Sequence, residues 1–169
     1  MKPGDLLGML GTVWASKLVE KIDHSEISHV AMVLCLDPLP LIIESTPEGV
    51  RTIPLEIVCA EHPRVFLLKA LTLTDAERVQ LIKSVCKFSA MGYSYLRCGL
   101  VGLDELSGST IFTQYLTKHL DPMCSFAMAS AYKDIGRDFG QPQEATSPGH
   151  ILNFARAHKN LYTVLQLKG

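Results

Sequence analysis

The sequence predicts an α+β fold, in which helices pack on an antiparallel β-sheet. Short β-rich runs follow one another through hairpin links, and the helical patterns are segregated from them. With 169 residues, the chain is long enough for one domain with a proper core and too short for two ordinary ones, so we expect a single domain over residues 1–169. Hydrophobic residues make up 47% of the chain and charged residues 20%, which favours a packed globule over a disordered chain.

Six stretches have the composition of strands. Residues 28–36 and 41–45 are rich in β-branched and aliphatic side chains and flank the sequence DPLP, so they predict an antiparallel hairpin. After the turn TPEG, residues 50–55 alternate between two faces. The other strands are predicted at residues 4–10, 64–71 and 161–167.

A capping-box pattern predicts that a helix begins at Thr74. The side chains of Thr74 and Glu77 can each accept a hydrogen bond from the other's backbone N–H, and a helical run follows. Gly92 is expected to stop this helix. Its inner face is expected to consist of Val79, Ile82, Val85 and Cys86.

Later helices are marked by Asp-Pro and Ser-Pro steps. Asp121 can cap a helix whose first position is Pro122, and apolar residues recur at helical spacing from Cys124 to Gly136. Ser147 and Pro148 repeat this pattern. Further helices are expected at residues 13–22 and 110–120, and a surface loop at 93–109.

Composition excludes several classes of function. The net charge is −1 and the basic residues are scattered, so the chain lacks the positive surface of a nucleic-acid binder. No apolar run is long enough to span a bilayer and no signal-peptide core is visible, so we expect a soluble cytoplasmic protein. Five cysteines without a CxxC pair suit neither a disulfide framework nor a structural zinc site, and we expect most of them to be reduced core residues.

Cys124 differs from an ordinary buried thiol by its place in the first turn of a helix. The unpaired backbone N–H groups and the positive end of the helix dipole favour the thiolate there, which lowers the pKa of a cysteine. The same N–H groups can donate to an oxyanion. The sequence therefore predicts a nucleophile that still needs a base.

His29 is the candidate base among six histidines. It opens a strongly apolar strand, where an imidazole needs a partner, whereas His24, His62, His119 and His158 are interpreted as surface residues. If residues 35–40 form the hairpin loop, Leu34 lies opposite Leu41 and Ala31 lies opposite Glu44, which puts Glu44 diagonally beside His29 on the same face. A carboxylate there would orient the imidazole. An ordinary polar pair at the margin of a sheet fits these two residues equally well.

A family resemblance favours catalysis. The segments KPGDLL, SHVAMV, IIESTPEGVRTIPL, MGYSY, CSFAMASAYKDIG and TSPGHILNF resemble, in this order, the NlpC/P60 superfamily in its circularly permuted papain-like branch, which has bacterial YiiX-like and short poxvirus-type members. The resemblance covers nearly the whole chain and implies a papain-like fold of permuted topology, an antiparallel sheet or barrel with helices on it. In this branch the histidine precedes the polar residue and the cysteine comes last, as His29, Glu44 and Cys124 do.

The resemblance implies a cysteine hydrolase that needs no metal or organic cofactor and forms a thioester on Cys124. Tyr93 and Tyr95 are candidate substrate-binding residues, as a tyrosine is in relatives, or they simply pack. Many bacterial members have an acidic residue where this chain has Phe126, which leaves the substrate open. A small amide or peptide is the first candidate substrate, an acyl lipid is the second, and a non-catalytic binding module is the third reading. The oligomeric state is not predicted.

Overall fold

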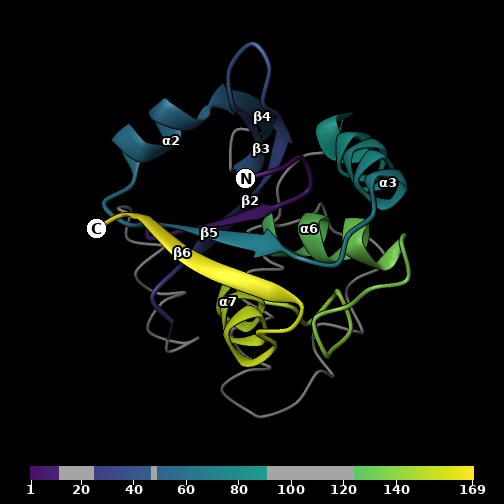
Figure 1. The fold of residues 1–169 in the computed structure, drawn as a ribbon. Helices are drawn as coiled ribbons and strands as arrows, with labels where there is room; N and C mark the ends of the chain where they lie inside the picture. Colours follow the sequence, from purple (N-terminus) through teal and green to yellow (C-terminus); the bar gives the residue numbers. More distant parts are fainter. Residues whose placement is uncertain (12–24, 47–48, 91–123) are drawn as a thin grey trace.

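The computed structural model describes residues 1–11, 25–46, 49–90 and 124–169 (Figure 1). Within these residues the fold is α+β, as predicted, with a six-stranded antiparallel sheet and four α-helices. The strands are β1 (Leu6–Met9), β2 (His29–Cys35), β3 (Leu41–Thr46), β4 (Gly49–Pro54), β5 (Val65–Ala70) and β6 (Tyr162–Lys168). The helices are α2 (Leu55–Glu61), α3 (Asp75–Cys86), α6 (Cys124–Lys133) and α7 (Pro148–Ala157), with a 3₁₀ turn, η1, at Lys87–Ala90. The expected helices at 13–22 and 110–120, the stop at Gly92 and the loop at 93–109 lie outside the described residues.

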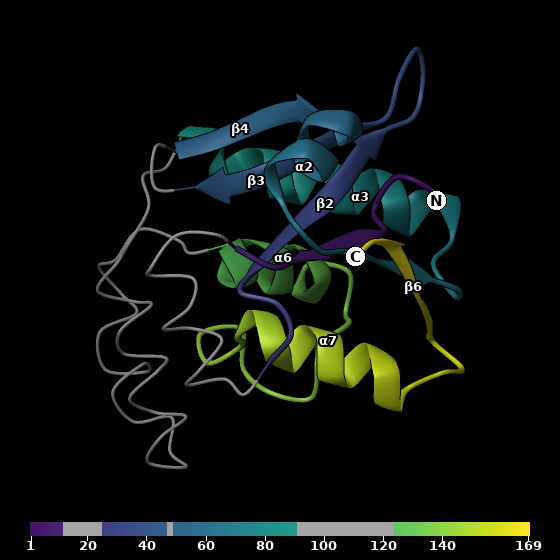
Figure 2. The ribbon, with the colours of Figure 1, turned by 90° about the vertical axis from the view of Figure 1, so that its left-hand side faces the viewer.

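The sheet has the strand order β4-β3-β2-β1-β5-β6, and every neighbouring pair is antiparallel. The strands β2, β3 and β4 follow one another as hairpins on one side, whereas β1, β5 and β6 come from distant parts of the chain (Figure 2). The predicted hairpin of β2 and β3 and the predicted strands at both ends of the chain are therefore confirmed. The hairpin strands carry His29, Glu44 and Arg51.

Helices cover both faces of the sheet, so the core has two parts. The larger part lies between one face and the helices α3, α6 and α7, and it includes Leu6, Met32, Leu68, Met128 and Ile151 (Figure 1). The smaller part lies between the other face and α2. This separation follows from the alternation of side chains along each strand. The helix α2 was not predicted.

The structure confirms the start of α3 but not its expected inner face. Thr74 accepts a hydrogen bond from the backbone of Glu77 and Glu77 accepts one from the backbone of Thr74, which completes the capping box. The buried residues are instead Arg78, Leu81, Ser84 and Val85. Val79 is 55% exposed and Cys86 is exposed, so two of the four expected core positions were wrong, whereas Ile82 is half-buried and packs against the core.

The reason lies in a buried ion pair that rotates the helix. Nη1 of Arg78 donates to Asp5 at 3.0 Å and to the carbonyl of Pro3 at 2.7 Å, and Nη2 donates to the carbonyl of Ala70 at 2.8 Å. Asp5 is fully buried and also accepts from the backbone N–H of Ala70. An arginine that binds both the N-terminal segment and the end of β5 must face the core, which turns Val79 outward.

Of the two late helices, α7 begins where the sequence places it, whereas the predicted cap Asp121 and first position Pro122 of α6 lie outside the described residues. Cys124 is the first residue of α6, and Ala127, Met128 and Ala131 lie buried along the same helix. In α7, Ser147 accepts a hydrogen bond from the backbone N–H of His150 and Pro148 is the first helical residue. None of the helices in the described part of the chain is long and apolar enough to cross a membrane.

Candidate active site

The start of β2 is fixed by bonds to the end of β1. The backbone N–H of Ser28 donates to the carbonyl of Met9, and the Ser28 hydroxyl accepts from the N–H of Gly11 at 2.9 Å. His29 then pairs with Met9 as the first residue of the strand. The imidazole is thereby held at the rim of the sheet, where its side chain remains 14% exposed.

The pairing of β2 with β3 places Glu44 beside His29. Ala31 lies opposite Glu44, as predicted, so Glu44 and His29 are diagonal neighbours. The predicted pair of Leu34 with Leu41 is wrong, because Cys35 lies opposite Leu41 and the register shifts between Val33 and Cys35. A bulge of this kind adds one residue to one strand. It is confined to the loop end of the hairpin, so the pairing at Glu44 is unaffected.

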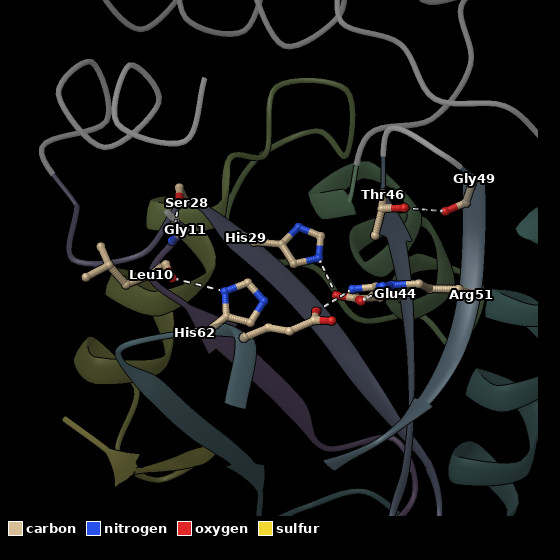
Figure 3. A network of polar contacts seen from close by, with 10 residues as sticks. Leu10, Gly11, Ser28, His29, Glu44, Thr46, Gly49, Arg51 and His62 are labelled. Atoms are coloured by element: carbon tan, nitrogen blue, oxygen red, sulfur yellow. Dashed lines mark hydrogen bonds and ion pairs between the residues drawn. The ribbon is translucent and has the colours of Figure 1, made fainter. Parts of the chain in front are cut away.

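His29 and Glu44 are in direct contact (Figure 3). Nε2 of His29 donates to Oε2 of Glu44 at 2.8 Å, and the Glu44 side chain is only 1% exposed. A carboxylate can only accept, so this bond puts the proton on Nε2 in the neutral imidazole. The other ring nitrogen, Nδ1, is then free to act as an acceptor. This is the tautomer that a general base requires.

Cys124 meets the imidazole from the head of α6. The thiol is 2% exposed and makes a side-chain hydrogen bond with His29. The backbone N–H groups of Val30 and Ser125 also point to the sulfur. The sulfur of Cys124 is therefore bound by groups from both α6 and β2. Cys124, His29 and Glu44, which were predicted from the sequence, form one series of hydrogen bonds.

The charges in this series stabilise one another. Burial by itself raises the pKa of the Cys124 thiol, but the positive charge of His29 and the hydrogen bonds to the sulfur outweigh burial and lower it. Burial lowers the pKa of His29, but Cys124 and Glu44 raise it to about 10. These opposite shifts favour a thiolate beside an imidazolium. The catalytic roles of the three residues stay a prediction.

Glu44 is held as a carboxylate from both sides. Burial raises its pKa, but hydrogen bonds and charge interactions with His29 and Arg51 lower it to about 2. Nε of Arg51 donates to Oε1 of Glu44 at 2.6 Å (Figure 3). Nη2 of Arg51 donates to Glu61 at 2.7 Å. The sequence interpretation missed Arg51, although it could have been found, because Glu44 and Arg51 lie directly opposite each other in the β3–β4 hairpin.

The interpretation of His62 as a surface residue was wrong. His62 caps the end of α2, it is half-buried, and its ring stacks on that of His29 with the centroids 6.2 Å apart and an angle of 17°. Its Nδ1 lies 3.0 Å from the carbonyl of Leu10 (Figure 3). Burial and the charge of His29 lower its pKa. No sequence signal indicated this position, because α2 itself was not predicted. His158 is also half-buried and stacks on Phe154.

The remaining predicted site residues are only partly described. Tyr93 and Tyr95 lie outside the described residues, so their substrate-binding role stays a prediction. Phe126 is half-buried and packs edge-on against Phe88, with ring centroids 6.1 Å apart. Among the four described cysteines, which are free, only Cys124 is buried, so the expectation that most cysteines are core residues was wrong for this part of the chain. Cys35 and Cys59 are half-buried, and Cys86 is exposed.

Comparisons with known proteins identify the fold. No protein-family model and no curated protein sequence matches the chain. Among solved structures, the chain is similar to the crystal structure of the metalloprotein YiiX from Escherichia coli O157:H7, with a TM-score of 0.63 and 17% sequence identity. The match covers 83% of this chain and 69% of YiiX. The described α+β architecture is therefore a YiiX-like fold.

Proposed function

We propose that the chain is a cysteine-dependent hydrolase of the amidase or peptidase type, from the circularly permuted papain-like branch of the NlpC/P60 superfamily. One observation carries this proposal: a thiol at the start of a helix contacts an imidazole whose other nitrogen is bound by a buried carboxylate. A nucleophile, a base and an orienting group in this order are the parts of a catalytic triad. The YiiX-like fold supports the proposal.

The mechanism follows from the protonation states. Nδ1 of His29 already holds the proton of the Cys124 thiol in the ion pair that the shifted pKa values favour, and the thiolate attacks the carbonyl carbon of an amide. The carbonyl oxygen becomes an oxyanion, for which the backbone N–H of Cys124 is a donor at the head of α6. The imidazolium then protonates the leaving amine, which leaves a thioester on Cys124. Water, deprotonated by His29, attacks the thioester and releases the acid and the free thiol.

Glu44 acts through His29 in this scheme. Its bond to Nε2 fixes the ring and stabilises the positive charge that forms when Nδ1 takes up the proton. Since Glu44 is almost fully buried and its pKa is lowered to about 2, it stays ionised throughout the physiological pH range. It therefore supports the imidazolium without taking up the proton itself.

The described side chains around Cys124 do not fit a metal ion, although YiiX is described as a metalloprotein. The described residues of this chain contain no group of three or more His, Cys, Asp or Glu side chains that could hold a metal ion. The His29 ring, which would be the natural nitrogen ligand, is already bound to Glu44 and Cys124. Each step above is therefore assigned to side chains and backbone groups of this chain.

The aromatic pair of Phe126 and Phe88 favours a second candidate, a lipid acyltransferase or phospholipase. Phe126 lies two residues after the nucleophile and is not fully buried. An apolar side chain at this position suits an acyl chain better than a charged peptide. The chemistry at Cys124 would be the same, with an ester oxygen as the leaving group. Comparing the hydrolysis of acyl esters in micelles with that of peptide amides separates the two substrates, and absence of turnover on lipid esters rejects the second candidate.

The first test is labelling with an electrophilic acyl-thiol probe. We expect the Cys124→Ala variant to lose labelling at residue 124 and all hydrolytic activity. Cys86→Ala is a matched control, because Cys86 is exposed and lies outside the site. It should lose only the labelling of its own peptide. Hydrolysis that persists in the Cys124→Ala variant refutes the proposal, and an ordinary alkylation rate of Cys124 at neutral pH favours the non-catalytic binding module.

A further inference from the structure

The second oxygen of the Glu44 carboxylate is bound by Arg51. Oε2 of Glu44 accepts from His29, and Oε1 accepts from Nε of Arg51 at 2.6 Å (Figure 3). The guanidinium extends further, since Nη2 of Arg51 donates to Glu61 at the end of α2 at 2.7 Å. Arg51 therefore connects the proposed triad to a neighbouring helix through two hydrogen bonds.

These two bonds differ in what they can do. The side chains of Arg51 and Glu61 are 43% and 42% exposed, so their pair is a surface ion pair of the kind that contributes little. The bond from Arg51 to Glu44 ends on a carboxylate that is 1% exposed. A buried carboxylate that loses one of two charged partners bears a large desolvation cost. Of the two bonds, the one from Arg51 to Glu44 therefore affects the ionisation of the buried carboxylate.

The position of Arg51 is set by the sheet. Glu44 and Arg51 lie directly opposite each other on β3 and β4, and Ala31, two residues after His29, lies opposite Glu44 on β2. Imidazole, carboxylate and guanidinium thus form one row across three adjacent strands. Because Nε of Arg51 donates a hydrogen bond to Oε1 of Glu44, the carboxylate cannot rotate freely. Its other oxygen, Oε2, stays directed at the imidazole of His29.

We propose that Arg51 is a positioning residue, which holds the Glu44 carboxylate ionised and directed at Nε2 of His29. This inference rests on the proposed function, because it assigns Arg51 a role only through the His29–Cys124 pair. This role of Arg51 also explains how the buried carboxylate of Glu44 stays ionised and stabilises the imidazolium of His29.

The charges of the row alternate in sign from Cys124 to Glu61 when the thiolate has formed. The groups that face Glu44 or its neighbours in the described residues are Cys124 on α6, His29 on β2, Arg51 on β4, and Glu61 and His62 at the end of α2. Without Arg51, Glu44 keeps His29 but loses one of the two partners that offset its burial, so its protonation moves to higher pH. A protonated Glu44 no longer stabilises the imidazolium, and the thiolate then forms only at higher pH.

The test is the pH dependence of Cys124 alkylation by iodoacetamide, resolved by peptide mass spectrometry so that the other cysteines do not contribute. Arg51→Met removes the charge and keeps an unbranched side chain that reaches about as far as Nε of the arginine. Arg51→Lys keeps the charge but offers no fork for two carboxylates. Glu61→Gln is the matched control, because it breaks the outer ion pair and leaves the bond to Glu44 in place. Thermal unfolding of each variant shows whether it is folded.

We expect the Arg51→Met variant to shift the acid limb of the alkylation profile upward by about one pH unit, which makes Cys124 about tenfold less reactive on that limb. The acid limb of Arg51→Lys should lie between those of the wild type and Arg51→Met. Glu61→Gln should leave the alkylation profile unchanged. If Arg51→Met does not fold, Arg51→Gln, which also removes the charge, takes its place, and an unchanged profile in that variant overturns the inference. If the acid limb of the wild type lies at low pH and Arg51→Met does not move it, this inference is overturned and the proposed function is not. A wild-type Cys124 that reacts as an ordinary thiol, with a midpoint of about pH 8.5, overturns the proposed function as well.

Discussion

The substitution Glu44→Gln probes the center of the site at nearly constant shape. Both oxygens of Glu44 accept charged hydrogen bonds, from His29 at 2.8 Å and from Arg51 at 2.6 Å. Glutamine offers one oxygen and one NH₂ group, so the NH₂ group must face one of these two donors. If it faces His29, the ring can accept this bond only by moving its proton to Nδ1, the nitrogen that must accept the proton of Cys124. We therefore expect a loss of both stability and thiol reactivity.

The size of the stability effect follows from the proton affinity of Glu44. Its pKa is lowered from 4.5 to about 2 in the folded protein, and a tenfold change in affinity is worth about 1.4 kcal/mol. The charged form of Glu44 thus contributes at most about 3 kcal/mol above the unfolded pKa, and this contribution is lost as the pH falls through 4.5 toward 2. For a chain of this length, about 3 kcal/mol corresponds to a lowering of Tm by about 6–12 °C.

The contribution of the Glu44–His29 interaction to the free energy of unfolding also changes at high pH. The pKa of His29 is raised to about 10, partly by Glu44. Stability from the imidazolium is therefore present below the unfolded pKa of 6.5 and is lost as the pH rises toward 10. The bond from Arg51 to Glu44 persists there, because a guanidinium does not titrate. The difference in stability between wild type and Glu44→Gln should be largest between about pH 5 and pH 6.5.

The assay is urea unfolding of both proteins at several pH values from 3 to 9, with iodoacetamide labelling of Cys124 at each pH. We expect the difference in unfolding free energy to shrink at both ends of this range. A difference that is constant across pH would mean that the charge of Glu44 is unimportant and that only its packing matters. A Glu44→Gln variant with unchanged Cys124 reactivity would contradict the orienting role of Glu44.

Three further substitutions test other contacts by thermal unfolding. Arg78→Met leaves the fully buried Asp5 without its charged partner and should cost about 3–5 kcal/mol, whereas combining it with Asp5→Asn should recover part of this loss. Ser147→Ala removes the N-cap of α7 and should cost about 1 kcal/mol, or about 2–4 °C in Tm. His62→Phe keeps an aromatic ring beside His29 but loses the bond to Leu10, so it should cost about 1 kcal/mol at pH 7.5. This last difference should narrow below pH 6.5, because the pKa of His62 is lowered and protonation there destabilises the wild type; a gap that widens instead would contradict this assignment.

The features that local rules govern could be predicted from the sequence. The capping box of Thr74 and the N-cap of Ser147 each depend on residues within three or four positions, and both are confirmed. The pairing of Ala31 with Glu44 depends on one hairpin, and it too is confirmed. These local rules were sufficient to bring His29 and Glu44 to the same face, and to put Cys124 at the start of α6.

The features that were missed depend on contacts between distant segments. The inner face of α3 is set by the bond of Arg78 to Asp5, which are 73 residues apart. An arginine is normally placed on the outside of a helix by its hydropathy, so the helical pattern alone favoured Val79. His62 reaches His29 only because α2 folds back over the sheet, and nothing in the apolar pattern of residues 50–55 indicated this helix.

The register of two hairpins decides whether the site exists at all. Side chains alternate between the faces of a sheet, so a slip of one residue in β3 would carry Glu44 away from both His29 and Arg51. The structure contains an irregularity that could have caused such a slip, the bulge between Val33 and Cys35, but it lies on the loop side of Ala31. The ladder from Glu44 to Arg51 has no shift along β3 and β4. Because the irregularity is confined to the loop end of the hairpin, the row of charged side chains keeps its order.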